Sequence, residues 1–108
     1  MAFLMVSKII VPEGKTLYIR SGAADLAAQQ AAADGHIVGQ IRDGYVAPNP
    51  NNDIQPKVTG TIIQGTIWSN EEAYNTYMAN NVIQTDNAAR DAYNTQHGIT
   101  RTVQTLTI

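Results

Sequence analysis

Residues 3–11 read Phe-Leu-Met-Val-Ser-Lys-Ile-Ile-Val, and this stretch is the most informative in the chain. β-Branched and other apolar side chains dominate it, and Pro12 and Gly14 end the run, so it predicts a β-strand. Successive side chains of a strand point to opposite faces, and here both faces carry mostly apolar residues. We therefore predict that this strand lies at the centre of a sheet and is covered on both sides.

The rest of the sequence alternates between helical and extended patterns, and Thr16 to Arg20 fits either a short strand or the lead-in to a helix. Further strands are predicted at 36–46, 59–68 and 99–108, and helices at 21–34, 70–79 and 85–97. Residues 47–58, rich in proline and asparagine, form a loop of a length that is usually functional or mobile.

Capping residues mark the ends of the predicted helices. Ser21 is the expected N-cap of the first helix, and Gly35 follows its last turn. The stretch Ser69-Asn70-Glu71-Glu72 reads as a capping box with Ser69 at the N-cap. Thr85 or Asp86 would cap the third helix, which ends before Gly98. In the first helix, we expect the face containing Ala23, Leu26, Ala27 and Ala31 to pack against the sheet.

The predicted order, β-α-β-β-α-α-β, matches the split β-α-β topology of a ferredoxin-like α+β fold. We expect residues 1–108 to form one domain with a single antiparallel four-stranded sheet and helices on one face. The other face would expose a larger apolar patch than monomers normally do. A second copy packed on that face would cover it, so we predict a homodimer in which two sheets form a barrel.

Composition excludes several classes of protein. The net charge is −2, the pI is about 5.5 and the basic residues are scattered, which argues against nucleic-acid binding. No cysteine is present, and no apolar run could span a membrane, so we expect a soluble, cytoplasmic protein without membrane contact. Charged residues make up only 15% of the chain. This low value fits either a lineage-wide composition bias or a surface that is covered in an assembly.

Three motifs resemble one known family. They are Pro12-Glu13-Gly14-Lys15 after the first strand, the strand-to-helix junction from Thr66-Ile67-Trp68-Ser69 to Tyr74, and the break between helices at Asn80-Asn81. In these motifs the chain is similar to the dimeric α+β barrel superfamily, in particular its antibiotic-biosynthesis-monooxygenase-like branch. The resemblance implies a ferredoxin-like homodimer. Members include cofactor-free, quinone-forming monooxygenases and haem-degrading oxygenases.

The resemblance does not extend to haem chemistry. Haem-degrading members use an asparagine, a tryptophan and an iron-binding histidine, and the matching positions here are Ser7, Tyr77 and Asn87. None of these residue types is retained, and a neutral amide is a weak substitute for imidazole on iron. We therefore expect no cofactor and no metal.

Four residues are candidates for a ligand pocket between the sheet and the helices: Ser7, Trp68, Tyr77 and Asn87. Each polar or aromatic side chain also has a structural interpretation. Trp68 could simply anchor a helix to the sheet, Tyr77 could belong to the core, and the Ser7 hydroxyl could bond to its own surroundings. His36 and His97 both lie at predicted helix ends, where interaction with the helix dipole explains them better than a shared metal does.

The sequence is compatible with two functions and does not decide whether the protein is an enzyme. The first is a protein that binds a small apolar or aromatic ligand, with monooxygenase-like activity on an aromatic or quinone-like compound. The second is a non-enzymatic dimeric accessory or assembly protein. A concave, apolar cavity with Ser7 and Tyr77 in its wall would favour the first.

Overall fold

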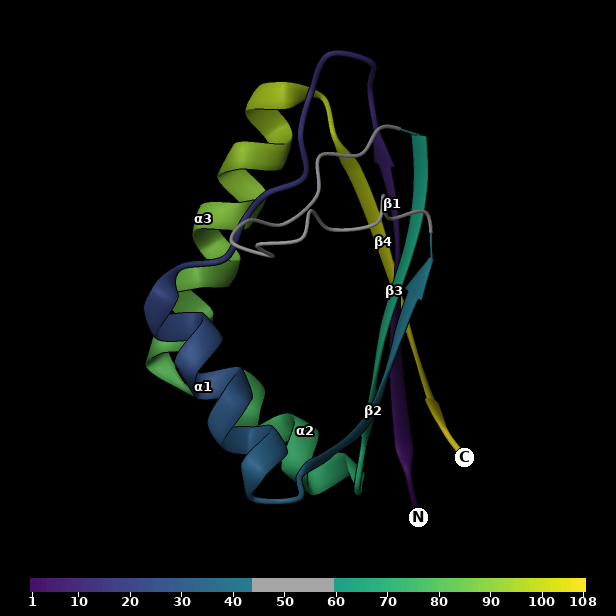
Figure 1. Cartoon of the computed structure of the whole chain (residues 1–108), viewed down its shortest axis with the longest axis vertical. Helices are drawn as coiled ribbons and strands as arrows, with labels where there is room; N and C mark the ends of the chain where they lie inside the picture. The colour runs from purple at the N-terminus through teal and green to yellow at the C-terminus, as the bar shows by residue number, and fades with distance from the viewer. Residues whose placement is uncertain (44–59) are drawn as a thin grey trace, which may run out of the picture.

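A computed structural model describes residues 1–43 and 60–108 and confirms the predicted fold class (Figure 1). The elements follow one another in the predicted order, β-α-β-β-α-α-β. Their bounds are β1 (Phe3–Val11), α1 (Gly22–Ala33), β2 (Ile37–Asp43), β3 (Gly60–Trp68), α2 (Glu71–Met78), α3 (Asn81–His97) and β4 (Thr100–Thr107). The predicted loop at 47–58 and the end of the predicted second strand lie outside the described residues.

The strands form one antiparallel sheet in the order β2-β3-β1-β4, with β1 in a central position as predicted. All three helices lie on one side of it (Figure 1). The odd-numbered side chains of β1 face the helices, and Phe3, Ser7, Ile9 and Val11 are buried there. We call this the inner face of the sheet, and the opposite one the outer face.

A bulge in β2 corrects the predicted arrangement of its side chains. The sequence pattern places Ile37 and Ile41 on the same face, but the pairing with β3 shifts by one residue between Ile37 and Gly39. Ile37 therefore lies on the inner face and Ile41 on the outer face, because an extra residue reverses the alternation beyond it. The shift also turns Gln40 and Arg42 inward.

Two helices begin at residues other than the predicted ones. Ser21 caps α1 as expected, and its hydroxyl accepts from the Ala24 amide at 3.1 Å. Asn70, and not Ser69, caps α2 by accepting from the Ala73 amide at 2.8 Å. The third helix begins at Asn81 and not at the predicted residue 85, because Asn80, and not Thr85 or Asp86, caps it by accepting from the Val82 amide. Asparagine and serine cap helices about equally well, so the sequence pattern does not separate neighbouring candidates.

The face of α1 that packs on the sheet also differs from the prediction. Its buried residues are Ala24, Ala28 and Ala31, whereas Leu26 is 66% exposed. These alanines follow the spacing of one helix face, and their small side chains let α1 approach the sheet.

Two separate apolar clusters join the helices to the sheet. One contains Ile9, Val11, Ile62 and Ile99, with Leu17 and Tyr93 packed against it. The other contains Phe3, Ala31 and Trp68, with Ile37, Ala73, Tyr74 and Tyr77 around it. They occupy opposite ends of β1, so the middle of the inner face belongs to neither cluster.

The outer face carries no second layer among the described residues. Leu106 is 62% exposed, Val38 60% and Ile10 45%, and Leu4, Val6, Ile63 and Ile67 are only partly buried. We expected β1 to be covered on both sides. Within one copy of the chain, only its inner face is covered.

The corrected cap of α2 gives a direct test. Asn70→Ala removes the acceptor for the Ala73 amide and should lower the free energy of unfolding by about 1 kcal/mol. Ser69→Ala is the matched control and should change it by less than about 0.5 kcal/mol, because the hydroxyl makes no hydrogen bond at this cap. Urea unfolding followed by circular dichroism measures both. If Ser69→Ala lowered the free energy of unfolding more than Asn70→Ala does, Ser69 and not Asn70 would be the cap of α2.

Candidate functional site

A cavity of about 890 Å³ lies between the inner face of the sheet and the helices. All seven elements contribute to its wall, together with residues 17–20, which lead into α1. Because the two apolar clusters pack at the ends of the sheet, the cavity occupies the space between them. Its size is in the range of small-molecule sites.

All four candidate residues line this cavity, although they come from β1, β3, α2 and α3. Ser7 and Trp68 belong to the sheet, and Tyr77 and Asn87 to the helices opposite. The fold therefore brings the four together around one space. That they bind a ligand stays a prediction.

Trp68 combines the two interpretations proposed for it. Its side chain is 2% exposed, and its ring centre lies 4.8 Å from that of Tyr77 and 5.8 Å from that of Tyr74. It is therefore a packing anchor, yet it also forms part of the cavity wall. Its indole Nε1 is buried without a hydrogen-bond partner among the described residues. A buried donor without an acceptor costs free energy.

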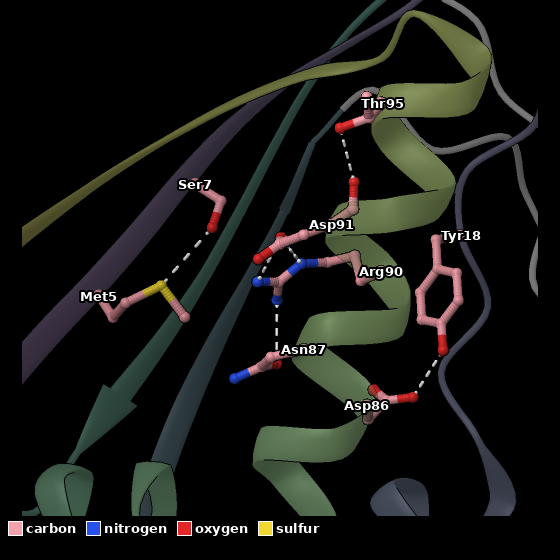
Figure 2. A network of polar contacts seen from close by, with 8 residues as sticks. All are labelled: Met5, Ser7, Tyr18, Asp86, Asn87, Arg90, Asp91 and Thr95. Carbon is pink, nitrogen blue, oxygen red and sulfur yellow. Dashed lines mark hydrogen bonds and ion pairs between the residues drawn. The ribbon is translucent and has the colours of Figure 1, made fainter.

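Ser7 lies in the floor of the cavity and is 1% exposed. Its hydroxyl donates to the thioether sulfur of Met5 at 3.6 Å (Figure 2). The strand pairing places Ser7 between Gln64 of β3 and Val103 of β4, and Arg42 lies beyond Gln64. Polar side chains of three neighbouring strands, Arg42, Gln64 and Ser7, therefore form a row across the middle of the inner face that ends at Val103.

Tyr77 lies at the aromatic end of the cavity, where burial raises the pKa of its phenol above 10. The guanidinium of Arg20 acts in the opposite direction and favours the ionised form, but burial has the larger effect. Tyr77 is therefore neutral at physiological pH and offers both a donor and an acceptor to the cavity.

Asn87 belongs to a polar network on the inner side of α3. Its Oδ1 accepts from Arg90 Nη1 at 3.1 Å, and Arg90 also contacts the carboxylate of Asp91 at 3.1 Å. Figure 2 shows that Asn87 and Arg90 extend from α3 on the side that faces Ser7 and Met5. Asn87 thus orients a guanidinium, a role that differs from that of the iron ligand at the matching position of the haem-degrading proteins.

Asp86 connects α3 to the segment before α1. Its carboxylate accepts from the Tyr18 hydroxyl at 2.7 Å and from the Ser21 amide at 2.9 Å. The hydrogen bond to Asp86 raises the pKa of Tyr18, because phenolate could not donate to the carboxylate. This contact holds one edge of the cavity in place.

The main feature that the sequence analysis missed is the charge of the cavity. All four arginines of the chain, Arg20, Arg42, Arg90 and Arg101, line it, so it is not the apolar pocket that was expected. One signal was present in the sequence. Ile83, Asn87, Arg90 and Asn94 follow helical spacing, which places Arg90 on the same face as two buried residues. The arginines of β2 and β4 gave no such signal, because Arg42 faces inward only as a result of the bulge and β4 is polar on both faces.

The two histidines are separate from this site. They end up at opposite ends of the molecule, because α1 and α3 run in opposite directions (Figure 1). His97 stacks on Tyr93 with ring centres 4.3 Å apart, and His36 is exposed. In the described part of the chain, no three histidine or acidic side chains are grouped closely enough to bind a metal ion. Within the same residues, no helix is both long and apolar enough to cross a membrane.

Comparison with solved structures identifies the fold. An alanine variant of SnoaB, a cofactor-independent oxygenase from Streptomyces nogalater, aligns with 99% of this chain and 92% of its own at a TM-score of 0.52 and 11% identity. A candidate antibiotic biosynthesis monooxygenase from Deinococcus radiodurans aligns with 98% and 91% at a TM-score of 0.51 and 10% identity. The chain shares the ferredoxin-like α+β fold of these two proteins. Neither a protein-family profile nor a curated protein matches the sequence.

The raised pKa of Tyr77 predicts a loss of stability at alkaline pH. The unfolded chain releases this proton near pH 10, whereas the folded chain retains it to higher pH. The free energy of unfolding should therefore fall as pH rises above about 10. Tyr77→Phe lacks the proton, so its stability should fall less steeply, with Tyr18 accounting for part of the remaining slope. Urea unfolding at several pH values between about 9 and 11 measures the two slopes. Equal slopes would contradict the burial of this phenol.

Proposed function

We propose that the protein binds an aromatic or quinone-like compound in this cavity and oxidises it with molecular oxygen, without a cofactor. The observation that carries this proposal is the cavity itself, whose wall combines Trp68, Tyr74 and Tyr77 with several hydrogen-bonding groups. Aromatic walls with a few placed polar groups are typical of sites for planar organic ligands. The fold shared with SnoaB, a cofactor-independent oxygenase, supports the same class of chemistry.

The active form in this proposal is a homodimer joined through the outer faces of two sheets. Leu4, Val6, Ile63, Ile67 and Leu106 share that face by strand register, and no other element of the described chain covers them. A second sheet packed at about 10 Å would remove these side chains from water. The inner cavity would then lie on the opposite side of each sheet, away from the contact between subunits.

An accessory or assembly protein is the second candidate, and the exposed outer face favours it too. Such a protein would dimerise in the same way but would need no ligand. The two functions therefore differ in the cavity and not in the interface, so ligand binding and oxygen consumption distinguish them.

A pair of leucine substitutions tests the dimer. Leu106 on the outer face and Leu26 on α1 are similarly exposed, at 62% and 66%. We expect the wild-type chain to sediment as a dimer of the 11.7 kDa subunit, Leu106→Glu to shift it toward the monomer, and Leu26→Glu to leave it dimeric. Sedimentation velocity at micromolar concentration reads out all three. A monomeric wild type would rule out the proposed interface.

Anthrone serves as a probe for the oxygenase activity. One anthrone and one dioxygen give one anthraquinone and one water, so the ring carbon loses two hydrogens and gains one oxygen atom. We expect the wild type to accelerate oxygen uptake over the uncatalysed rate. Tyr77→Phe should lower the enzymatic rate roughly tenfold, as expected for the loss of one hydrogen bond to a bound ligand.

The control for this assay is Tyr93→Phe. It also removes the hydroxyl of a helix tyrosine, but this hydroxyl lies outside the cavity and is hydrogen-bonded to Thr16. It should retain wild-type activity at temperatures where it stays folded. Quenching of Trp68, the only tryptophan of the chain, reports binding separately from turnover. A dimer that neither binds anthraquinone nor consumes oxygen would favour the assembly function.

A further inference from the structure

The arginines of the chain gather around the cavity, although the net charge of the chain is −2. Arg20, Arg42, Arg90 and Arg101 line its wall together with Asp25 and Asp86, and Asp91 lies against Arg90. The two described lysines, Lys8 and Lys15, are exposed and do not line it. The positive charge is therefore concentrated in one place.

The carboxylates in the wall already have partners. Asp25 lies 3.3 Å from Arg20 and also accepts from Gln29 at 2.8 Å. Asp86 is occupied by the Tyr18 hydroxyl and the Ser21 amide. Neither carboxylate is thus available to Arg101.

Arg101 differs from the other arginines in its contacts. It lies on the inner face of β4 opposite Ile9, it is partly buried, and no hydrogen bond or ion pair joins its guanidinium to a described residue. Arg90, by contrast, is held by Asn87 and Asp91. Burial lowers the pKa of Arg101, the positive charge of Arg90 lowers it further, and the more distant Asp91 compensates in part.

A guanidinium in this position has donors in a planar fork, the geometry that matches a carboxylate. We propose that the ligand of the cavity is an aromatic acid whose carboxylate binds Arg101, with Arg90 beside it, while its rings lie toward Trp68 and Tyr77. This inference rests on the proposed function and adds the charge and the orientation of the ligand.

The strand register determines the shape of such a ligand. Phe3 pairs with Trp68 and Ile9 pairs with Arg101, so the aromatic and cationic ends are six residues apart along β1, about 20 Å between backbones. Both kinds of side chain project from the sheet into the cavity. An elongated, polycyclic acid would contact both ends, whereas a single-ring acid would reach only one.

Two matched compounds test the proposal by isothermal titration calorimetry on the intact protein. Anthraquinone-2-carboxylate and anthraquinone-2-carboxamide have nearly the same shape but differ in charge. We expect the acid to bind at least tenfold more tightly than the amide, as charge-assisted hydrogen bonds allow. This comparison needs no variant, so it holds even if a substituted chain fails to fold.

Arg101→Gln should weaken binding of the acid at least tenfold and leave binding of the amide unchanged. Lys15→Gln removes the same charge at an exposed turn and should change neither. Arg101→Lys keeps the charge without the planar fork and should recover only part of the affinity.

Equal affinity of the wild type for acid and amide would overturn the inference while leaving the proposed function intact. An Arg101→Gln variant that loses both compounds equally would do the same, because the residue would then shape the cavity without recognising charge. If neither compound binds the wild type, the proposed function fails, and this inference fails with it.

Discussion

The pairing of β1 with β3 on one side and β4 on the other is the constraint on which the fold and the site both rest. Nine residues of β1 pair with β3 and eight with β4, which fixes every side chain of the strand to one face or the other. Its inner residues near the two ends enter the two apolar clusters and hold the helices in place. The middle of the strand, at Met5 and Ser7, contributes to the cavity floor. One strand therefore provides both the core and the base of the site.

Much of the fold could be predicted because local patterns and the global arrangement agree. The run from Phe3 to Val11 indicated a central strand, and Ser21, Gly35 and Gly98 lie at the helix ends where they were expected. The errors arise where neighbouring residues have equal local preference. Asn70 and Ser69 are both good caps, and only the path of the chain after β3 selects between them. The bulge at Val38 was missed, although Gly39 lies beside it and a glycine inside a strand often marks a bulge.

The candidate site was predictable in its position but not in its chemistry. Ser7 and Trp68 could be placed by strand alternation, and Tyr77 and Asn87 through the family resemblance, so their meeting around one cavity follows from the topology. The arginines could not be assigned, because each depends on a long-range feature. Arg42 faces inward only as a result of the bulge in β2, and the polar pattern of β4 does not show which face Arg101 occupies. The resemblance described an aromatic pocket and carried no information about charge.

Placing positive charge in a partly buried space works against stability, and this cost bears on how the cavity is interpreted. Burial lowers the pKa of Arg101, and the positive charge of Arg90 lowers it further. A chain with so few charged residues could have kept its arginines on the surface, where water would solvate them fully. Asn87 and Asp91 contact Arg90 and reduce this cost on α3, whereas no side chain of the described residues makes a hydrogen bond or ion pair with the guanidinium of Arg101. An anion bound between the two guanidiniums would offset the repulsion between them and would supply the hydrogen bonds that Arg101 lacks, so the cavity would be more stable with its ligand than without it.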